Sequence, residues 1–79
     1  MAFSFYQLGK IPVIQAKIDD LNKKYDHDIY ALRKENDHVY VFEVDTGEDL
    51  ECAILMEMNG ELFPISDDAY ELVSVVLGQ

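Results

Sequence analysis

Hydrophobic residues recur at helical spacing in the first third of the chain. They are separated by four, three and four positions and therefore share one helical face: Ile14, Ile18, Leu21 and Tyr25. Pro12 suits a first helical turn, where its missing N–H has no partner in any case. This pattern predicts a helix from about Pro12 to about Tyr25. Residues 2–8 alternate loosely between apolar and polar, which leaves open a short strand or an ordered arm.

The middle of the chain carries segments rich in β-branched and aromatic residues, separated by turn residues. We expect four strands, at residues 28–34, 39–44, 50–58 and 61–65. Residues 35–38 supply the first turn, residues 45–49 form a hairpin loop, and Asn59-Gly60 is the preferred type I′ dipeptide. Pro64 lacks a backbone N–H, which predicts that the last strand lies at a sheet edge.

A second helix is predicted from about Asp67 to Leu77. Ser66 is a good N-cap, Asp67 and Asp68 suit the positive end of the helix dipole, and Gly78 can close the last turn. Its apolar face contains Ala69, Leu72, Val73, Val76 and Leu77. The whole chain, residues 1–79, is thus expected to be one α+β domain. It contains a helix, an antiparallel meander of about four strands and a second helix, with both helices on one face of the sheet.

The loop at residues 45–49 suggests a register for the two strands that it joins. If all five residues are in the loop, Val44 pairs with Leu50, and the layer under the helices contains Phe42 opposite Cys52 and Tyr40 opposite Ile54. The opposite layer then has an apolar centre with glutamates beside it: Val39, Val41, Ala53, Leu55 and Leu62 with Glu43, Glu51 and Glu57.

This outer layer has the features of a binding face. Glu43 opposite Glu51 is a like-charge pair, which costs stability. An exposed apolar patch with a charged rim is typical of an interface. Two alternatives stay open: the register is shifted by one residue, or the N-terminal arm covers the patch.

Charge is unevenly distributed along the sequence. All six bases lie between Lys10 and Lys34, whereas residues 35–79 contain twelve acids and no base, and the net charge is −10. Such a chain is repelled by nucleic acid and by anionic membranes and attracted to a basic partner. The alternative is that the acids only keep the protein soluble.

The compartment is expected to be the cytoplasm. The N-terminal residues lack the basic and apolar regions of a secretory signal, and the longest uncharged apolar run is short, Cys52–Met56. Cys52 is the only cysteine, which excludes an internal disulfide, and the register above places it in the core.

No catalytic, cofactor or metal motif is present. His27 and His38 lie in predicted turns without a placed nucleophile, the four glycines form no phosphate loop, and residues 45–49 lack the EF-hand spacing. We therefore expect no enzyme, no cofactor and no metal site.

The function that these observations favour is a non-enzymatic acidic inhibitor of a basic protein, such as a nuclease or another nucleic-acid-handling enzyme. In size and charge alone the chain resembles phage-encoded DNA mimics of the anti-defence type, antitoxins and nuclease-immunity proteins. The expected partner-binding residues are Glu43, Asp45, Glu48, Asp49, Glu51, Glu57, Val39, Val41 and Leu55, with Asp67, Asp68 and Glu71 as a second patch. The alternative is a structural or adaptor module, most simply a homodimer, that uses the apolar centre or sets its basic stretch against the acidic half of another copy.

Overall fold

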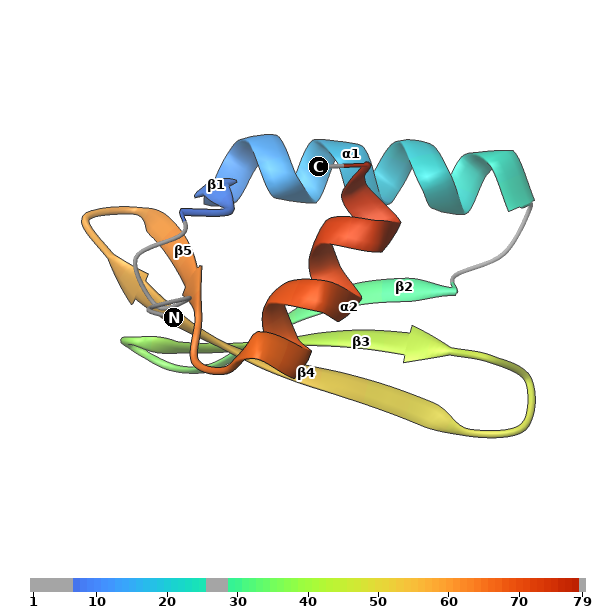
Figure 1. Cartoon of the computed structure of the whole chain (residues 1–79). Coiled ribbons are helices and arrows are strands. Elements are labelled where there is room, and N and C mark those ends of the chain that lie inside the picture. The colour runs from blue at the N-terminus through green and yellow to red at the C-terminus, as the bar shows by residue number, and fades with distance from the viewer. Residues whose placement is uncertain (1–6, 26–28, 79) are drawn as a thin grey trace.

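The fold is α+β, as the sequence predicts. A computed structural model describes residues 7–25 and 29–78 of the chain. The elements in chain order are β1 (Gly9–Lys10), α1 (Ile11–Tyr25), β2 (Tyr30–Asn36), β3 (Val39–Asp45), β4 (Leu50–Met58), β5 (Glu61–Pro64) and α2 (Asp67–Leu77). Both helices lie on the same side of a curled sheet (Figure 1).

The sheet contains five antiparallel strands in the order β1-β5-β4-β3-β2. The additional strand is β1, which pairs Gly9 with Leu62 and Lys10 with Glu61. It lies just after the loosely alternating residues 2–8. Of these, residues 2–6 are outside the described part of the chain. The predicted edge position of β5 is therefore wrong at Glu61 and Leu62. Pro64 lies beyond the residues that β1 pairs, so its missing N–H removes no bond to β1.

The local signals at the turns and helix ends are confirmed. Ser66 Oγ accepts a hydrogen bond of 3.1 Å from the backbone N–H of Ala69, as an N-cap does. Gly78 closes α2 in the left-handed region at φ 74°. Asn59 and Gly60 have φ values of 55° and 80°, the sign that a type I′ turn needs at both central positions.

The loop between β3 and β4 has four residues, one fewer than predicted. Asp45 belongs to β3 and pairs with Leu50. Its Oδ1 accepts a hydrogen bond of 2.9 Å from Gly47 N–H, while Thr46 Oγ1 accepts one of 3.0 Å from Asp49 N–H. These bonds close the loop within residues 46–49, so the predicted pairing of Val44 with Leu50 is wrong by one position.

A slip of one residue turns every side chain of a strand to the other face. The face predicted for β3 is confirmed, with Phe42 in the core, but the face predicted for β4 is wrong. Leu55 is 0% exposed and lies under the helices, whereas Cys52 and Ile54 lie on the outer side and are exposed. Glu43 is opposite Cys52, so the predicted Glu43–Glu51 pair does not form.

The core lies between the sheet and the two helices. Phe42 is fully buried at its centre, with the ring of Tyr30 stacked on it at a centroid distance of 6.3 Å. The helices contribute Ile14, Ile18, Ala69, Val73 and Leu77, and the sheet adds Ala53, Leu55 and Leu62. Asn22 links α1 to the start of β2. Its side-chain Oδ1 accepts hydrogen bonds from the backbone N–H groups of Ile29 and Tyr30, both at 2.9 Å.

Candidate functional site

One side of α2 combines acids with the exposed Val75 and with two half-buried hydrophobic residues, Leu72 and Val76, that lie at the margin of the core. Its positions are separated by three, four and seven residues and so form one stripe along the helix: Asp68, Glu71, Leu72, Val75 and Val76. Val75 is 75% exposed, the highest exposure of a large hydrophobic residue in the described chain. The opposite side of the helix packs into the core through Ala69, Val73 and Leu77. The two acids and Val75 are therefore available to a ligand, while Leu72 and Val76 offer it their exposed sides.

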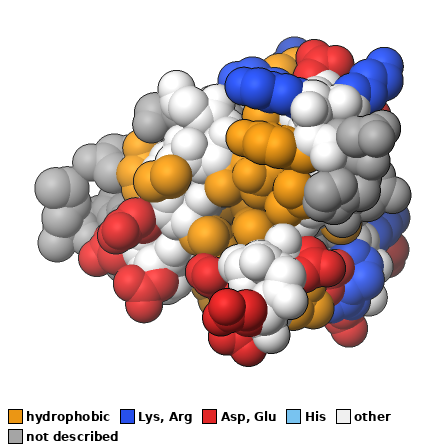
Figure 2. Space-filling view, turned by 90° about the vertical axis from the view of Figure 1, so that its right-hand side faces the viewer, with side chains coloured by type: hydrophobic (Ala, Val, Ile, Leu, Met, Phe, Trp, Pro, Cys, Tyr) orange, Lys and Arg blue, Asp and Glu red, His pale blue; other side chains and the backbone are white. Residues whose placement is uncertain are grey.

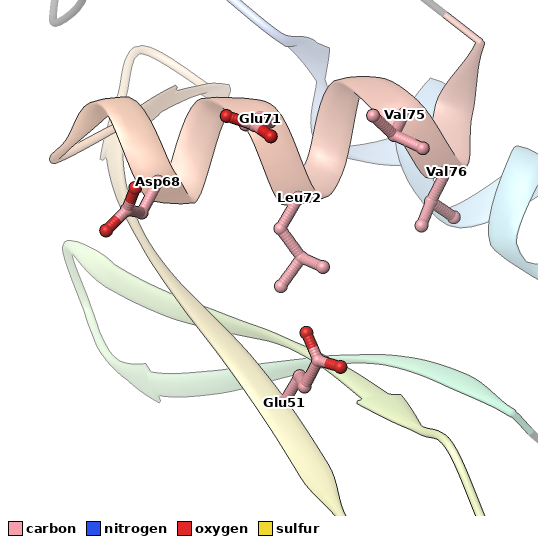
Figure 3. A pocket seen from close by; sticks show the side chains of 6 residues that line it. All are labelled: Glu51, Asp68, Glu71, Leu72, Val75 and Val76. Carbon is pink, nitrogen blue, oxygen red and sulfur yellow. The ribbon is translucent and has the colours of Figure 1, made fainter.

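Strand β4 adds a third carboxylate to this stripe. Glu51 has the same orientation as Ala53 and Leu55, because alternate residues of a strand share a face. It lies nearer the loop end of the hairpin, where it is exposed and paired with Val44. Figure 3 shows the Glu51 carboxylate and the Leu72 side chain directed toward one another from β4 and α2.

Together these residues line an open groove of about 300 Å³. We call it the acidic groove, and its residues are Glu51, Asp68, Glu71, Leu72, Val75 and Val76. A neighbouring hollow of about 260 Å³ shares Val76 and extends the surface to Leu21 and Lys17 of α1. Figure 2 shows a central hydrophobic area on this side of the molecule, with Asp and Glu below it and a mixture of basic and acidic side chains above it. The surface is thus apolar at its centre and acidic along its lower rim, whereas the bases shown above it lie among acids.

The three carboxylates of the acidic groove are not neutralised by neighbouring bases. In residues 7–25 and 29–78 the ion pairs use other acids, namely Glu35, Glu43 and Glu57. A basic group brought into the groove would therefore meet three uncompensated charges at the border of an apolar surface. A bound partner that displaces water from the apolar surface would strengthen this attraction over that between fully solvated charges.

Two of the predicted glutamates are occupied elsewhere. Glu43 lies on the outer side of the sheet, with its Oε2 at 3.4 Å from Arg33 Nε. Glu57 Oε2 accepts a hydrogen bond of 2.8 Å from Gly60 N–H, and its Oε1 lies 3.3 Å from His38 Nδ1. The bond from Gly60, and after it the contact with His38, lowers the pKa of the Glu57 carboxyl. Glu57 thus holds the turn between β4 and β5.

The remaining predicted residues are distributed over three places. Asp45, Glu48 and Asp49 lie exposed at the loop end of the hairpin, and Asp67 is exposed in the first turn of α2. Val39 and Val41 are on the outer side of the sheet, where Val41 is nonetheless buried. Leu55 is in the core, so the prediction that it belongs to an exposed face is wrong.

The structure therefore unites residues that the sequence analysis had kept apart. Glu51 was assigned to the sheet face, whereas Asp68 and Glu71 formed a second patch, and the shifted register brings the three to one groove. Val75 belonged to none of the predicted sites. Its signal was available, because Val75 is an apolar residue outside the predicted core face of its helix.

Within residues 7–25 and 29–78, no three His, Cys, Asp or Glu side chains are grouped so that they could hold a metal ion. Neither described helix combines the length and the apolar character that crossing a bilayer requires.

Comparison of the chain with models of protein families, with curated proteins and with solved structures finds no match. The acidic groove is accordingly assigned from its own geometry and charge.

Proposed function

We propose that the protein is a non-enzymatic binding protein that captures a basic protein through the acidic groove. The observation that carries the proposal is the convergence of three unpaired carboxylates, Glu51, Asp68 and Glu71, around an open apolar surface. Two different elements, β4 and α2, build this site, and the exposed Val75 takes no part in the core.

The two kinds of residue have different roles in the proposed complex. Burial of an exposed Val75 side chain contributes roughly 1.5 kcal/mol, with smaller additions from the half-exposed Leu72 and Val76. The carboxylates select a basic partner and speed its approach, because complementary charges steer encounters. The electrostatic part of the affinity weakens in salt, since the Debye length falls from about 10 Å at 0.1 M to about 3 Å at 1 M.

The partner that fits best is a protein whose basic surface handles nucleic acid. A net charge of −10 opposes direct binding of nucleic acid to this chain, whereas a basic groove or loop of another protein is attracted. Occupation of that basic surface would exclude nucleic acid from it, so the protein acts as an inhibitor or antagonist. The exposed single cysteine, Cys52, suits a reducing compartment such as the cytoplasm.

Charge neutralisation at constant shape tests this proposal. The groove variant carries Glu51→Gln, Asp68→Asn and Glu71→Gln. The matched control removes the same amount of charge from exposed acids outside the groove through Asp19→Asn, Asp37→Asn and Glu48→Gln. Each protein is immobilised through a terminal tag and exposed to a cell lysate at low salt, and the retained proteins are identified by mass spectrometry.

We expect the wild type and the control variant to retain the same basic protein and to release it at high salt. The groove variant should not retain it, although its circular dichroism spectrum is unchanged. Equal retention by the groove variant would show that the acidic groove is not the site. The inhibitor role is then measured with the purified partner, whose binding to nucleic acid should fall as the wild-type protein is added and should not fall with the groove variant.

A further inference from the structure

The side of the sheet that faces away from the helices is apolar and uncovered by any described helix. We call it the outer face. Strand β4 supplies its centre with Cys52, Ile54, Met56 and Met58, and β3 and β5 flank it with Val41 and Phe63. Ile54 and Met56 are each 39% exposed, and Met58 is 51% exposed. A row of such residues on one strand is more than scattered surface hydrophobics, and contiguous patches of this kind mark interaction sites.

The outer face is almost neutral in a strongly acidic protein. The strand registers place two bases, Lys10 and Arg33, and three acids, Glu43, Asp45 and Glu61, on this side, for a net charge of −1. Glu35, at the irregularity in β2, adds one further acid that is bonded to Arg33. The chain as a whole carries −10. Most of the negative charge therefore lies away from the outer face.

The charges that are present on the outer face are of both signs and already adjacent. Arg33 Nε lies 3.4 Å from Glu43 Oε2 across the β2–β3 pair. The hydrogen bond to Glu35, with further attraction from Glu43, raises the pKa of the Arg33 guanidinium. A surface with both signs is complementary to a rotated copy of itself, because each base can meet the acid of the other copy. A uniformly acidic surface lacks this property.

The exposed edge of the sheet is a poorer place for self-association. β2 is an edge strand, and the side chain of Asn22 already bonds the backbone of Ile29 and Tyr30 at its start. Farther along, the pairing of β2 is interrupted between Lys34 and Asn36. Side-chain caps, bulges and charged residues of this kind are the devices that prevent strand-to-strand addition at an edge.

We propose that the outer face joins two copies of this chain about a twofold axis. Ile54, Met56 and Met58 of one copy pack against the same residues of the other, and Arg33 and Glu43 exchange partners at the rim. An isologous contact needs a patch that is complementary to itself, and the outer face meets this condition through its low net charge and paired signs. This surface is separate from the acidic groove, which lies on the helix side of the sheet.

Molar mass by sedimentation equilibrium tests the dimer. The chain has a mass of 9.1 kDa, and we expect twice that mass as the protein concentration rises. Ile54→Glu should weaken dimerisation at least about 100-fold, because the contact would bury two unpaired carboxylates. Val75→Glu is the matched control, since it places the same charge on an exposed hydrophobic residue of the acidic groove, and it should leave the dimer intact.

Three results would overturn the proposal. The first is a wild-type chain that stays at 9.1 kDa up to about 1 mM, which corresponds to a dimer free energy weaker than about 4 kcal/mol. The second is a dimer that Val75→Glu disrupts and Ile54→Glu does not. The third uses no variant: Cys52 lies on the outer face, so its reaction with a thiol reagent should slow as the dimer forms, and an unchanged rate in the dimer would place the contact elsewhere.

Discussion

Adjacent residues of β4 should differ sharply in their importance for stability. Leu55 is completely buried beneath the helices, whereas Ile54 lies on the outer face and is 39% exposed. Leu55→Ala and Ile54→Ala remove the same number of carbon atoms from neighbouring positions of one strand. The pair therefore tests the register of β4 directly, because a shift of one residue would exchange the two effects.

The sizes follow from burial. Leu55→Ala removes three carbon atoms from a closed core, a transfer cost of about 2.4 kcal/mol at about 0.8 kcal/mol per group. The cavity left in the buried core cluster adds to it, so we expect about 3 kcal/mol in the free energy of unfolding. Ile54 has about three fifths of its surface covered and borders solvent, so its truncation costs about 1.5 kcal/mol and leaves no closed cavity.

Urea denaturation followed by circular dichroism measures both values. The expected difference of about 1.5 kcal/mol corresponds to about 6 to 12 °C in Tm for a domain of this size. The titrations are run at two protein concentrations, so that any effect of Ile54 on self-association is separated from its effect on the fold. A cost for Ile54→Ala equal to or above that of Leu55→Ala would refute the register and the burial argument together.

Three further predictions concern the N-cap of α2, the turn between β4 and β5, and the dependence of stability on pH. Ser66→Ala removes the N-cap bond to Ala69 and should cost about 1 kcal/mol in urea denaturation. Gly60→Ala should also cost about 1 kcal/mol, entirely through the left-handed backbone, because nothing lies within 4 Å of an added Cβ. The pKa of Glu57 is lowered by Gly60 N–H and then by His38, so its carboxylate stabilises the fold fully above the ordinary glutamate pKa of about 4.3 and progressively less as pH falls through the lowered value. Glu57→Gln should flatten the acid side of the stability–pH curve, and a curve identical to that of the wild type would contradict this assignment.

The elements of the fold were predictable because their signals are local. Strand β4 and helix α2 have the predicted bounds, and α1 begins within one residue of its predicted start. Ser66, Gly78 and the Asn59-Gly60 turn each encode a backbone conformation through their own side chain or its absence. Neither the extra strand β1 nor its pairing with β5 has such a signal, since two residues show no periodicity.

The register of β4 was not predictable for a physical reason. Its two faces, Ala53 with Leu55 and Cys52 with Ile54, are both apolar, so hydrophobic alternation cannot indicate which side is buried. The choice depends on whether Asp45 ends β3 or begins the loop. Gly47 N–H donates to Asp45 Oδ1 and Asp49 N–H donates to Thr46 Oγ1. These bonds close the loop after Asp45, so Asp45 belongs to β3.

The prediction of the candidate site depended on the same feature, the number of residues in the loop between β3 and β4. Asp68 and Glu71 were recognised from their position at the start of α2, and Glu51 was recognised as a strand carboxylate. Their convergence requires that Glu51 face the helices, which only the correct register provides. An error of one residue in the predicted loop length thus placed the Glu51 carboxylate on the wrong side of the sheet. The residues of one groove were therefore predicted as two separate patches.

The two proposed surfaces lie on opposite sides of the sheet, and their electrostatics are opposite as well. The proposed contact of the acidic groove with a basic partner depends on unpaired carboxylates, so added salt should weaken it. The proposed dimer brings together two chains that each carry −10, so added salt should screen their mutual repulsion and strengthen the dimer. A dimer built through the outer face leaves both grooves directed outward, which makes it bivalent. Two linked grooves bind a partner with repeated basic sites more tightly than either groove alone, without any additional contact. The acidity on which the proposed partner capture depends is therefore compatible with the proposed self-association, because the sheet separates the charged surface from the nearly neutral one.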